Sequence, residues 1–235
     1  MSTSPTLAKP LPVYQQISEL LARRIKAGHW RKGERLPTEA ELSRQLSVAV
    51  GTLRKSLALL EAQGMLERIQ GSGTYVRATQ GAQNLYEFFR LELSDGPGLP
   101  TALILSLDRS ASPVALAGGS DCWRVRRLRL LNAQPVALEE IWFEAETCPT
   151  LTRAELGDSM YQFYQERFGF WIARVEDRLG VDSVPDWAVL PFGMKAGQFA
   201  GFVSRQSWTA ANVLAEYSRT WFDPAVCIYT SRMSQ

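Results

Sequence analysis

The chain has 235 residues, of which 46% are hydrophobic and 21% charged, a composition typical of one large or two modest globular domains. Its three cysteines are scattered and it holds a single histidine, which argues against a disulfide framework, a zinc site and Ser-His-Asp chemistry. No apolar run approaches the ~18 residues that span a bilayer, and the first residues lack a signal-peptide core. We therefore expect a cytoplasmic protein without a metal or a cofactor.

The net charge of +2 is unevenly distributed along the chain. Residues 1–78 carry 12 Lys and Arg against 6 Asp and Glu, whereas the remainder carries 14 against 18. A basic N-terminal third is typical of a module that binds polyanions such as nucleic acid. Many solvated protein faces are also basic, so the charge alone does not decide between these interpretations.

The N-terminal dozen residues precede the first predicted helix. Residues 1–12 include three prolines, which fix the backbone and remove N–H donors, so we expect a flexible arm. From Val13 apolar residues recur at helical spacing until Gly28, a residue type suited to ending a helix. This pattern predicts a helix that begins at Val13.

Two further helices and a hairpin are predicted next. Thr38 followed by Glu41 is a capping box, in which the hydroxyl accepts a free backbone N–H and the carboxylate reaches back. A third helix follows, with leucines on one face, and then a glycine-bearing hairpin with strands over residues 65–69 and 74–76. Three helices and a hairpin in this order predict a winged helix-turn-helix over residues 13–76.

The third predicted helix and the hairpin carry the candidate DNA contacts. In a helix-turn-helix motif the second helix, which is the third predicted helix of this chain, enters the major groove. Its N-terminal residues lie nearest the base edges. The residues left outward on that helix, and those at the tip of the hairpin, are Gly51, Thr52, Arg54, Lys55, Gln70, Gly71 and Ser72. Arg54 and Lys55 also suit a merely solvated face, but the ordered set of helices, basic residues and glycine wing favours DNA.

Beyond residue 76 the pattern changes. Small and polar residues over 77–84 predict a linker, and residues 85–235 predict a second domain. Its apolar stretches predict strands over residues 102–107, 122–131, 136–143, 172–181, 199–208 and 215–221, with helices over 152–168 and 186–190. This mixture favours an α+β domain built on an antiparallel sheet.

A basic strand in the second domain is a candidate anion site. Alternation places Arg127 and Arg129 on one face of the strand, where two guanidinium groups can bind a carboxylate or a phosphate. A turn over residues 132–135 brings Glu139 of the next strand near them. A strand face that is simply solvated, or arginines that pair with Glu139 and Glu140, would account for the same pattern, so these interpretations stay open.

The motif PTEAELSRQLSVAVGTLRKSLALLEAQGMLERIQGSGTYV resembles the DNA-binding domain of the GntR family of transcription regulators, and the resemblance covers residues 13–76. It implies DNA-contacting roles for Thr38, Gly51, Thr52, Arg54, Gln70 and Gly71. Two positions depart from the family pattern. Ala40 stands where arginine or another polar residue is usual, and Val50 stands where the third helix usually has arginine. Arginine is the commonest reader of guanine, so these departures affect the expected operator sequence more than DNA binding itself.

Residues 85–230 resemble the UTRA effector domain of the HutC subfamily, through the segments RLRLLNAQPVALEEIWF, MYQFY and AEYSRTWFDP. The resemblance implies a fold similar to that of chorismate lyase. It also implies an effector pocket that contains Arg127, Arg129, Glu139, Tyr161 and Glu216.

The expected protein is a homodimeric transcription regulator, specifically a repressor whose affinity for a palindromic DNA operator changes when a small, anionic effector binds. The alternative from another class is a C-terminal domain with chorismate-lyase-like enzymatic activity and DNA binding as an accessory. The sequence offers this alternative no general base, metal site or nucleophile.

Overall fold

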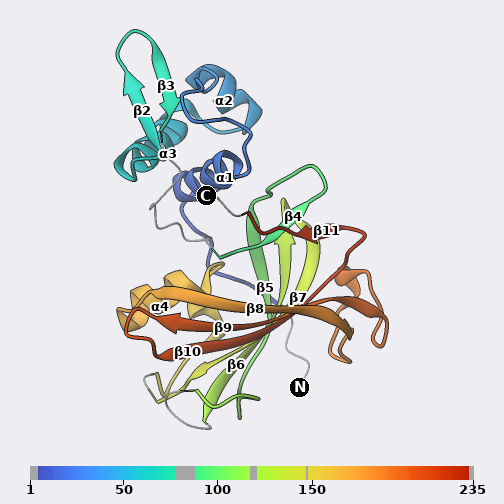
Figure 1. Ribbon diagram of the computed structural model, residues 1–235. Coiled ribbons are helices and arrows are strands. Elements are labelled where there is room, and N and C mark those ends of the chain that lie inside the picture. The colour runs from blue at the N-terminus through green and yellow to red at the C-terminus, as the bar shows by residue number, and fades with distance from the viewer. Residues whose placement is uncertain (1–4, 78–87, 117–120, 147, 233–235) are drawn as a thin grey trace. The chain divides into compact units, whose positions relative to one another are not determined.

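The computed structural model describes residues 5–77, 88–116, 121–146 and 148–232, and it divides into two compact units (Figure 1). The winged unit comprises Leu11–Leu99 and Tyr229–Gln235, and the sheet unit comprises Met1–Pro10 and Pro100–Ile228. The predicted linker over residues 77–84 lies, apart from its first residue, outside the described residues. Within the described part of the chain no helix is long and apolar enough to cross a membrane.

The winged unit contains the predicted three helices and hairpin. Its elements are α1 (Val13–Lys26), α2 (Glu39–Gln45), α3 (Val50–Ala62), β2 (Leu66–Ile69) and β3 (Gly73–Val76), with a further short strand β4 (Leu91–Leu93). Strands β2 and β3 pair antiparallel and form the wing. The two strands of the wing and the three helices therefore lie within a few residues of the positions that the sequence predicts.

One apolar core joins the helices to the wing. Leu21 of α1, Leu42 of α2 and Leu53 of α3 are completely buried, and Met65 and Val76 extend the same cluster to the hairpin. Burying such side chains stabilises a fold by about 1.5–3 kcal/mol each. The leucine face of α3 is thus held inward, which leaves its opposite face free.

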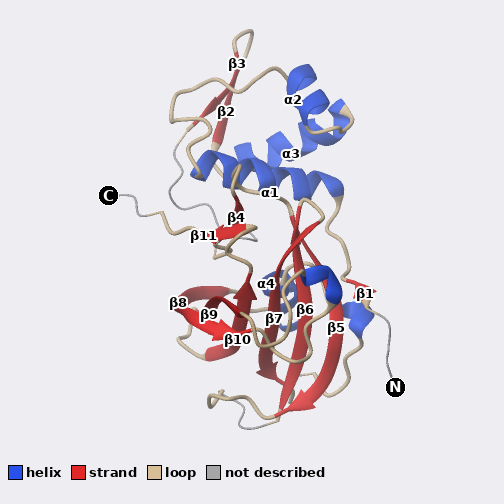
Figure 2. Cartoon of the chain, turned by 90° about the vertical axis from the view of Figure 1, so that its right-hand side faces the viewer, coloured by secondary structure: helices blue, strands red, loops and turns tan. Residues whose placement is uncertain are grey.

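The sheet unit is built on seven strands in the order β1-β5-β6-β7-β10-β9-β8 among the described residues (Figure 2). These strands are β1 (Thr6–Leu7), β5 (Pro100–Ser110), β6 (Cys122–Leu131), β7 (Gln134–Glu144), β8 (Ile172–Ser183), β9 (Phe199–Thr209) and β10 (Leu214–Phe222). Helix α4 (Met160–Phe168), the 3-10 turns η1 (Arg153–Glu155) and η2 (Leu190–Phe192), and strand β11 (Cys227–Tyr229) complete the described elements. Every pair in the sheet is antiparallel, and all six predicted strands are present.

Two helix predictions in the sheet unit are wrong in extent. The predicted helix over residues 152–168 is interrupted after η1, because the Asp158 side chain accepts a hydrogen bond from Ala102 N of β5 at 2.8 Å and Ser159 caps the start of α4. The helix predicted over 186–190 is absent. A single 3-10 turn, η2, begins only at the last residue of that segment and carries a proline within its first two positions.

The described part of the expected flexible arm has regular structure instead. Thr6 and Leu7 pair with Ile104 and Leu103 at the edge of β5. Ala8 N donates to Ala102 O at 3.0 Å. The prolines of this segment leave those N–H groups intact, so a short strand forms despite them.

The two faces of the sheet differ in character because side chains alternate along each strand. Leu128 of β6 pairs with Leu138 of β7, and both belong to an apolar cluster that includes Phe192 of η2. The register places Arg127 opposite Glu139 on the other face. That second face packs against α4, whose Tyr164 ring lies 5.4 Å from the ring of Phe143.

Candidate functional site

The N-terminus of α2 has the predicted capping box. Thr38 Oγ1 accepts from Glu41 N at 3.3 Å, while Glu41 Oε2 accepts from Thr38 N at 2.8 Å. The hydrogen bonds from Thr38 lower the pKa of the Glu41 carboxyl. Thr38 itself stays exposed, so its side chain remains at the surface beside the first turn of α2.

The outer face of α3 presents most of the predicted contacts to solvent. Gly51, Arg54 and Lys55 are exposed and Thr52 is half-buried, whereas Leu53 and Leu57 lie in the core. Ser56 donates its hydroxyl to Tyr14 O at 2.8 Å, which fixes α3 against α1. The helix is therefore rigidly seated with two cations and a glycine pointing outward.

The tip of the wing is a tight turn at the surface. Gly71 has a φ of +74°, a conformation that a residue with a side chain rarely adopts. Ser72 N donates to Ile69 O at 3.0 Å, and the Ser72 hydroxyl is 2.6 Å from Tyr75 OH. Gln70 is exposed. These contacts hold the three predicted wing residues in one defined loop.

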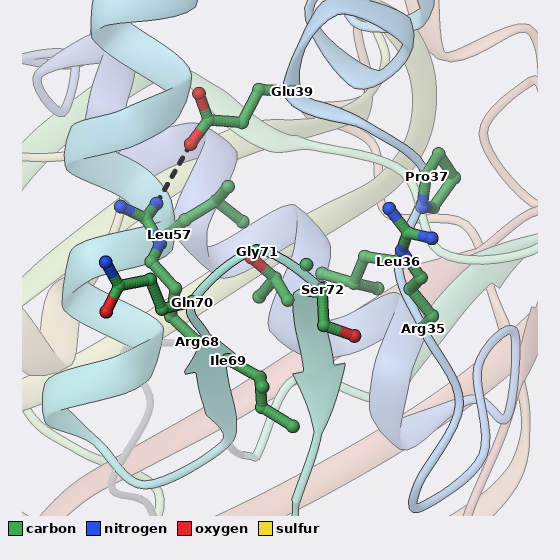
Figure 3. A pocket seen from close by; sticks show the side chains of 12 residues that line it. Arg35, Leu36, Pro37, Glu39, Leu57, Arg68, Ile69, Gln70, Gly71 and Ser72 are labelled. Carbon is green, nitrogen blue, oxygen red and sulfur yellow. Dashed lines mark hydrogen bonds and ion pairs between the residues drawn. The ribbon is translucent and has the colours of Figure 1, made fainter.

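A groove of about 460 Å³ lies between the wing and the start of α2 (Figure 3). Its lining includes Gln70, Gly71 and Ser72 from the wing tip, together with Arg68 of β2 and Glu39 of α2. Three of the candidate DNA contacts, Gln70, Gly71 and Ser72, thus line this groove, and a fourth, Arg54 of α3, forms an ion pair with its lining residue Glu39.

The two departures from the family pattern lie at the protein surface. Ala40 and Val50 are both exposed, Val50 by 36%. Exposed cations of the winged unit include Arg44 of α2, Arg54 and Lys55 of α3, and Arg68 of β2, and Arg35 lines the groove beside α2. A surface without cations at positions 40 and 50 still has the positive charge that phosphate binding needs.

A second candidate site lies in the sheet unit, where the two predicted arginines meet a buried carboxylate. Arg127 Nε is 2.5 Å from Glu139 Oε2, and Arg129 Nη2 is 3.1 Å from the same oxygen. Arg129 Nη1 also donates to Asp158 O at 3.0 Å. Arg127 and Arg129 are only 4% and 2% exposed. These residues therefore form an internal ion cluster, and this face of the strand is not solvated.

Glu216 of β10 extends the cluster toward α4 and β9. Its carboxylate accepts from Tyr164 OH at 2.7 Å and from Ser207 Oγ at 3.4 Å. Tyr161 OH lies 3.0 Å from the same Ser207 hydroxyl. The five residues predicted for an effector pocket are therefore brought together, although their role in binding stays a prediction.

Residues that the sequence prediction missed complete the cluster. Arg205 of β9 bonds Asp177 of β8 through Nε–Oδ1 at 2.5 Å and Nη2–Oδ2 at 2.6 Å, and it also bonds Tyr161. Tyr164 and Ser207 were missed as well. Nothing in the pattern of β8 or β9 indicates these contacts, because they depend on the register of β8, β9 and β10.

Burial and charge shift the acid–base behaviour of the cluster. Burial acts to raise the pKa of Glu139, but the charges of Arg127 and Arg129 outweigh it and lower the pKa to about 2. Burial raises the pKa of Glu216, against the opposing effects of its Tyr164 hydrogen bond and the charge of Arg127. Burial also raises the pKa of Tyr161 to about 12. Glu139 is thus firmly ionised, whereas Glu216 is the more easily protonated acid.

One donor of the cluster is unused. Arg127 Nη1 is buried and has no hydrogen-bond partner among the described residues. An unsatisfied buried donor costs about 1–3 kcal/mol, and more for a charged group. On the opposite face of β6, Arg126 pairs with Glu140 at 2.7 Å, so the arginines of this strand form two separate sets. In the described part of the chain, no cluster of three or more His, Cys, Asp or Glu is arranged to hold a metal.

Comparison with known proteins connects both units of the chain to regulators. Residues 13–76 match the bacterial regulatory proteins of the gntR family, and residues 107–225 match the UTRA domain. The HTH-type transcriptional regulator SmoD of Agrobacterium fabrum is 45% identical over 226 residues, which cover 95% of this chain and 97% of SmoD. The mannosyl-D-glycerate transport/metabolism system repressor MngR of Escherichia coli K12 is 31% identical and covers 72% of this chain and 73% of its own length.

Solved structures share the fold. The possible transcriptional regulator YydK of Bacillus subtilis has a TM-score of 0.53 at 21% identity, covering 95% of this chain and 100% of that one. The ligand-binding domain of a Bordetella bronchiseptica protein assigned to the GntR family has a TM-score of 0.55 at 20% identity, covering 63% of this chain and 99% of the other. YydK therefore shares the fold over nearly the whole chain, and the Bordetella domain shares the fold of a part of it.

Proposed function

The chain belongs to the GntR family of bacterial regulatory proteins, and from this premise we propose that it is a repressor that binds a palindromic operator as a homodimer in the cytoplasm. We further propose that a small anion bound in the sheet unit lowers its affinity for that operator. The observation that carries the DNA part is the outward, cationic face of α3 beside the glycine-tipped wing. A two-fold dimer would present two such faces to two half-sites.

The proposed DNA contacts divide into two kinds. Arg54 and Lys55 of α3 and Gln70 and Ser72 of the wing supply polar groups that suit phosphates or base edges. Gly51 and Gly71 carry no side chain and allow the backbone to approach the duplex closely. Thr38 and Thr52 offer hydroxyl groups at the starts of α2 and α3.

DNA binding is tested with Arg54→Ala in the full chain. Loss of one phosphate contact lowers affinity for operator and random duplex alike, and reduces the slope of log K against log salt by about 0.9. Arg178→Ala is a matched control, because it removes an exposed cation from β8 of the sheet unit. Fluorescence anisotropy over a salt series measures both variants. An unchanged slope for Arg54→Ala would remove this residue from the interface.

The anion site is proposed at the free Nη1 of Arg127. A buried guanidinium with one unused donor favours a ligand that brings an anionic or hydroxyl oxygen, and neighbouring hydroxyls of Tyr161 and Ser207 suit a polyol. The name of MngR mentions mannosyl-D-glycerate, which is a sugar joined to a carboxylate. An anionic sugar derivative is therefore the ligand class that we propose.

The ligand proposal is tested by a thermal-shift screen with sugar phosphates, sugar acids and inorganic sulfate. A ligand at 100 times its Kd stabilises the folded chain by about 2.7 kcal/mol. We expect Arg127→Ala to abolish the shift and Arg126→Ala, on the opposite face of β6, to retain it. A shift that persists in Arg127→Ala would place the site elsewhere. Turnover of a ligand in the same samples would instead support the enzymatic alternative.

A further inference from the structure

Glu39, the first residue of α2, bonds two arginines that come from two other elements. Its Oε2 lies 2.6 Å from Nε of Arg54 on α3, and its Oε1 lies 2.9 Å from Nη2 of Arg68 on β2 (Figure 3 shows the second contact). One carboxylate therefore connects α2, α3 and the wing.

The position of Glu39 makes this carboxylate a rigid anchor. It lies in the first turn of α2, where the helix dipole favours negative charge. The capping box at Thr38 fixes that turn. The side chain of Glu39 is 27% exposed, whereas the side chains of Arg54 and Arg68 are 64% and 48% exposed. The arginines thus reach out from a fixed, partly covered anion toward solvent.

These contacts are weak for folding but well placed for DNA. Exposed ion pairs contribute about 0–1 kcal/mol to stability, so this set explains little of why the winged unit folds. A DNA phosphate competes with Glu39 for the same guanidinium groups. While Glu39 holds them, the direction of each arginine is restricted and one positive charge is cancelled.

We propose that Glu39 is a positioning residue that sets the sequence selectivity of the winged unit. It restrains Arg54 and Arg68 so that they contact DNA well only when the duplex matches the geometry of α3 and the wing. It also reduces binding to unmatched DNA by its own charge. This inference rests on the proposed DNA binding, and it concerns selectivity and not affinity for DNA as such.

The proposal predicts opposite changes in affinity and selectivity for Glu39→Gln. Removing the negative charge of Glu39 leaves one more positive charge to bind DNA phosphate. The slope of log K against log salt then steepens by about 0.9, and the affinity for random duplex rises about fivefold to tenfold at 0.1 M salt. The freed arginines sample more directions, so the motif selected from a pool of random duplexes loses information content. Glu61→Gln is the matched control, since it removes an exposed carboxylate from the last turns of α3.

Glu39→Asp separates geometry from charge. The shorter side chain keeps the negative charge but does not span both guanidinium groups, so we expect random-duplex affinity to stay within twofold of wild type while selectivity falls. Thermal unfolding shows that each variant is folded. Should Glu39→Gln bind random DNA no more tightly than Glu61→Gln, or should all variants select the wild-type motif, the proposal is overturned. If the wild-type chain itself binds no duplex, the proposed function fails instead.

Discussion

Replacing Glu139 by glutamine tests whether the buried cluster is held together by charge. Glu139 is 7% exposed and lies against Arg127 and Arg129, whose guanidinium groups it neutralises. Glutamine has nearly the same shape but no charge, so the variant leaves two buried cations without their counter-ion. Breaking a buried pair by removing one partner typically costs 3–5 kcal/mol.

The pKa of Glu139 gives an independent magnitude and a sign. Lowering it from 4.5 to about 2 corresponds to about 3 kcal/mol of stabilisation at neutral pH. Because the folded pKa is depressed, this contribution is present above pH 4.5 and is lost as the pH falls toward 2. By pH 3 about 2 kcal/mol of it is gone. Glu139→Gln is therefore expected to be about 3 kcal/mol less stable than wild type at pH 7 but only about 1 kcal/mol less stable at pH 3.

Urea unfolding at a series of pH values measures this convergence. Six of the seven tryptophans, all except Trp30, belong to the sheet unit, so tryptophan fluorescence reports mainly on that unit. Glu140→Gln removes a carboxylate from the opposite face of β7 and controls for the general effect of such a substitution. A stability difference between wild type and Glu139→Gln that is equal at pH 7 and pH 3 would refute the argument, because the cost would then come from shape and not from charge.

Three further substitutions probe the core, the sheet and the DNA surface. Leu53→Ala leaves a cavity in the winged unit and is expected to cost about 2–5 kcal/mol, measured by urea unfolding followed by circular dichroism of the helices, three of which belong to that unit. Gly201→Ala places a methyl group into the ring of Phe222 and is expected to lower the unfolding free energy by about 1–3 kcal/mol; an unchanged thermal midpoint would contradict this. Val50→Arg supplies the family's missing arginine and should add a guanine to the motif selected from random duplexes, with about 1–3 kcal/mol of discrimination.

The winged unit was largely predictable because its signals are local. The capping box at Thr38 and Glu41 and the leucine spacing of α3 each depend on residues at most a few turns apart, and the structure has both. The short strand at Thr6 and Leu7 was missed for the opposite reason. It exists only because β5, about a hundred residues later, offers an unpaired edge.

The cluster in the sheet unit was predictable only in part. Arg127 and Glu139 are joined by a short hairpin, so strand alternation alone places them together. Arg205 and Asp177 lie on β9 and β8, at the other end of the strand order, and the hydrogen bond of Arg205 with Tyr161 requires the order β7-β10-β9-β8, which no local pattern contains. Local patterns therefore predict the part of the cluster that the hairpin of β6 and β7 builds. The family resemblance adds Tyr161 and Glu216, and the contacts of Arg205 and Asp177, which depend on long-range pairing, are missed.

The charge balance of the cluster limits what it can bind. Apart from its tyrosines, whose hydroxyls are neutral, its ionisable groups are three arginines and four acids: Arg127, Arg129, Arg205, Glu139, Asp158, Asp177 and Glu216. With every acid ionised the set carries one excess negative charge, which disfavours an anion at Arg127. Burial raises the pKa of both Asp158 and Glu216, so these two acids are the ones that take up a proton most readily. With both protonated the set carries one excess positive charge, and a monoanion at the free Nη1 of Arg127 would then leave it neutral. A site built this way would bind its anion together with protons, and more tightly as the pH falls.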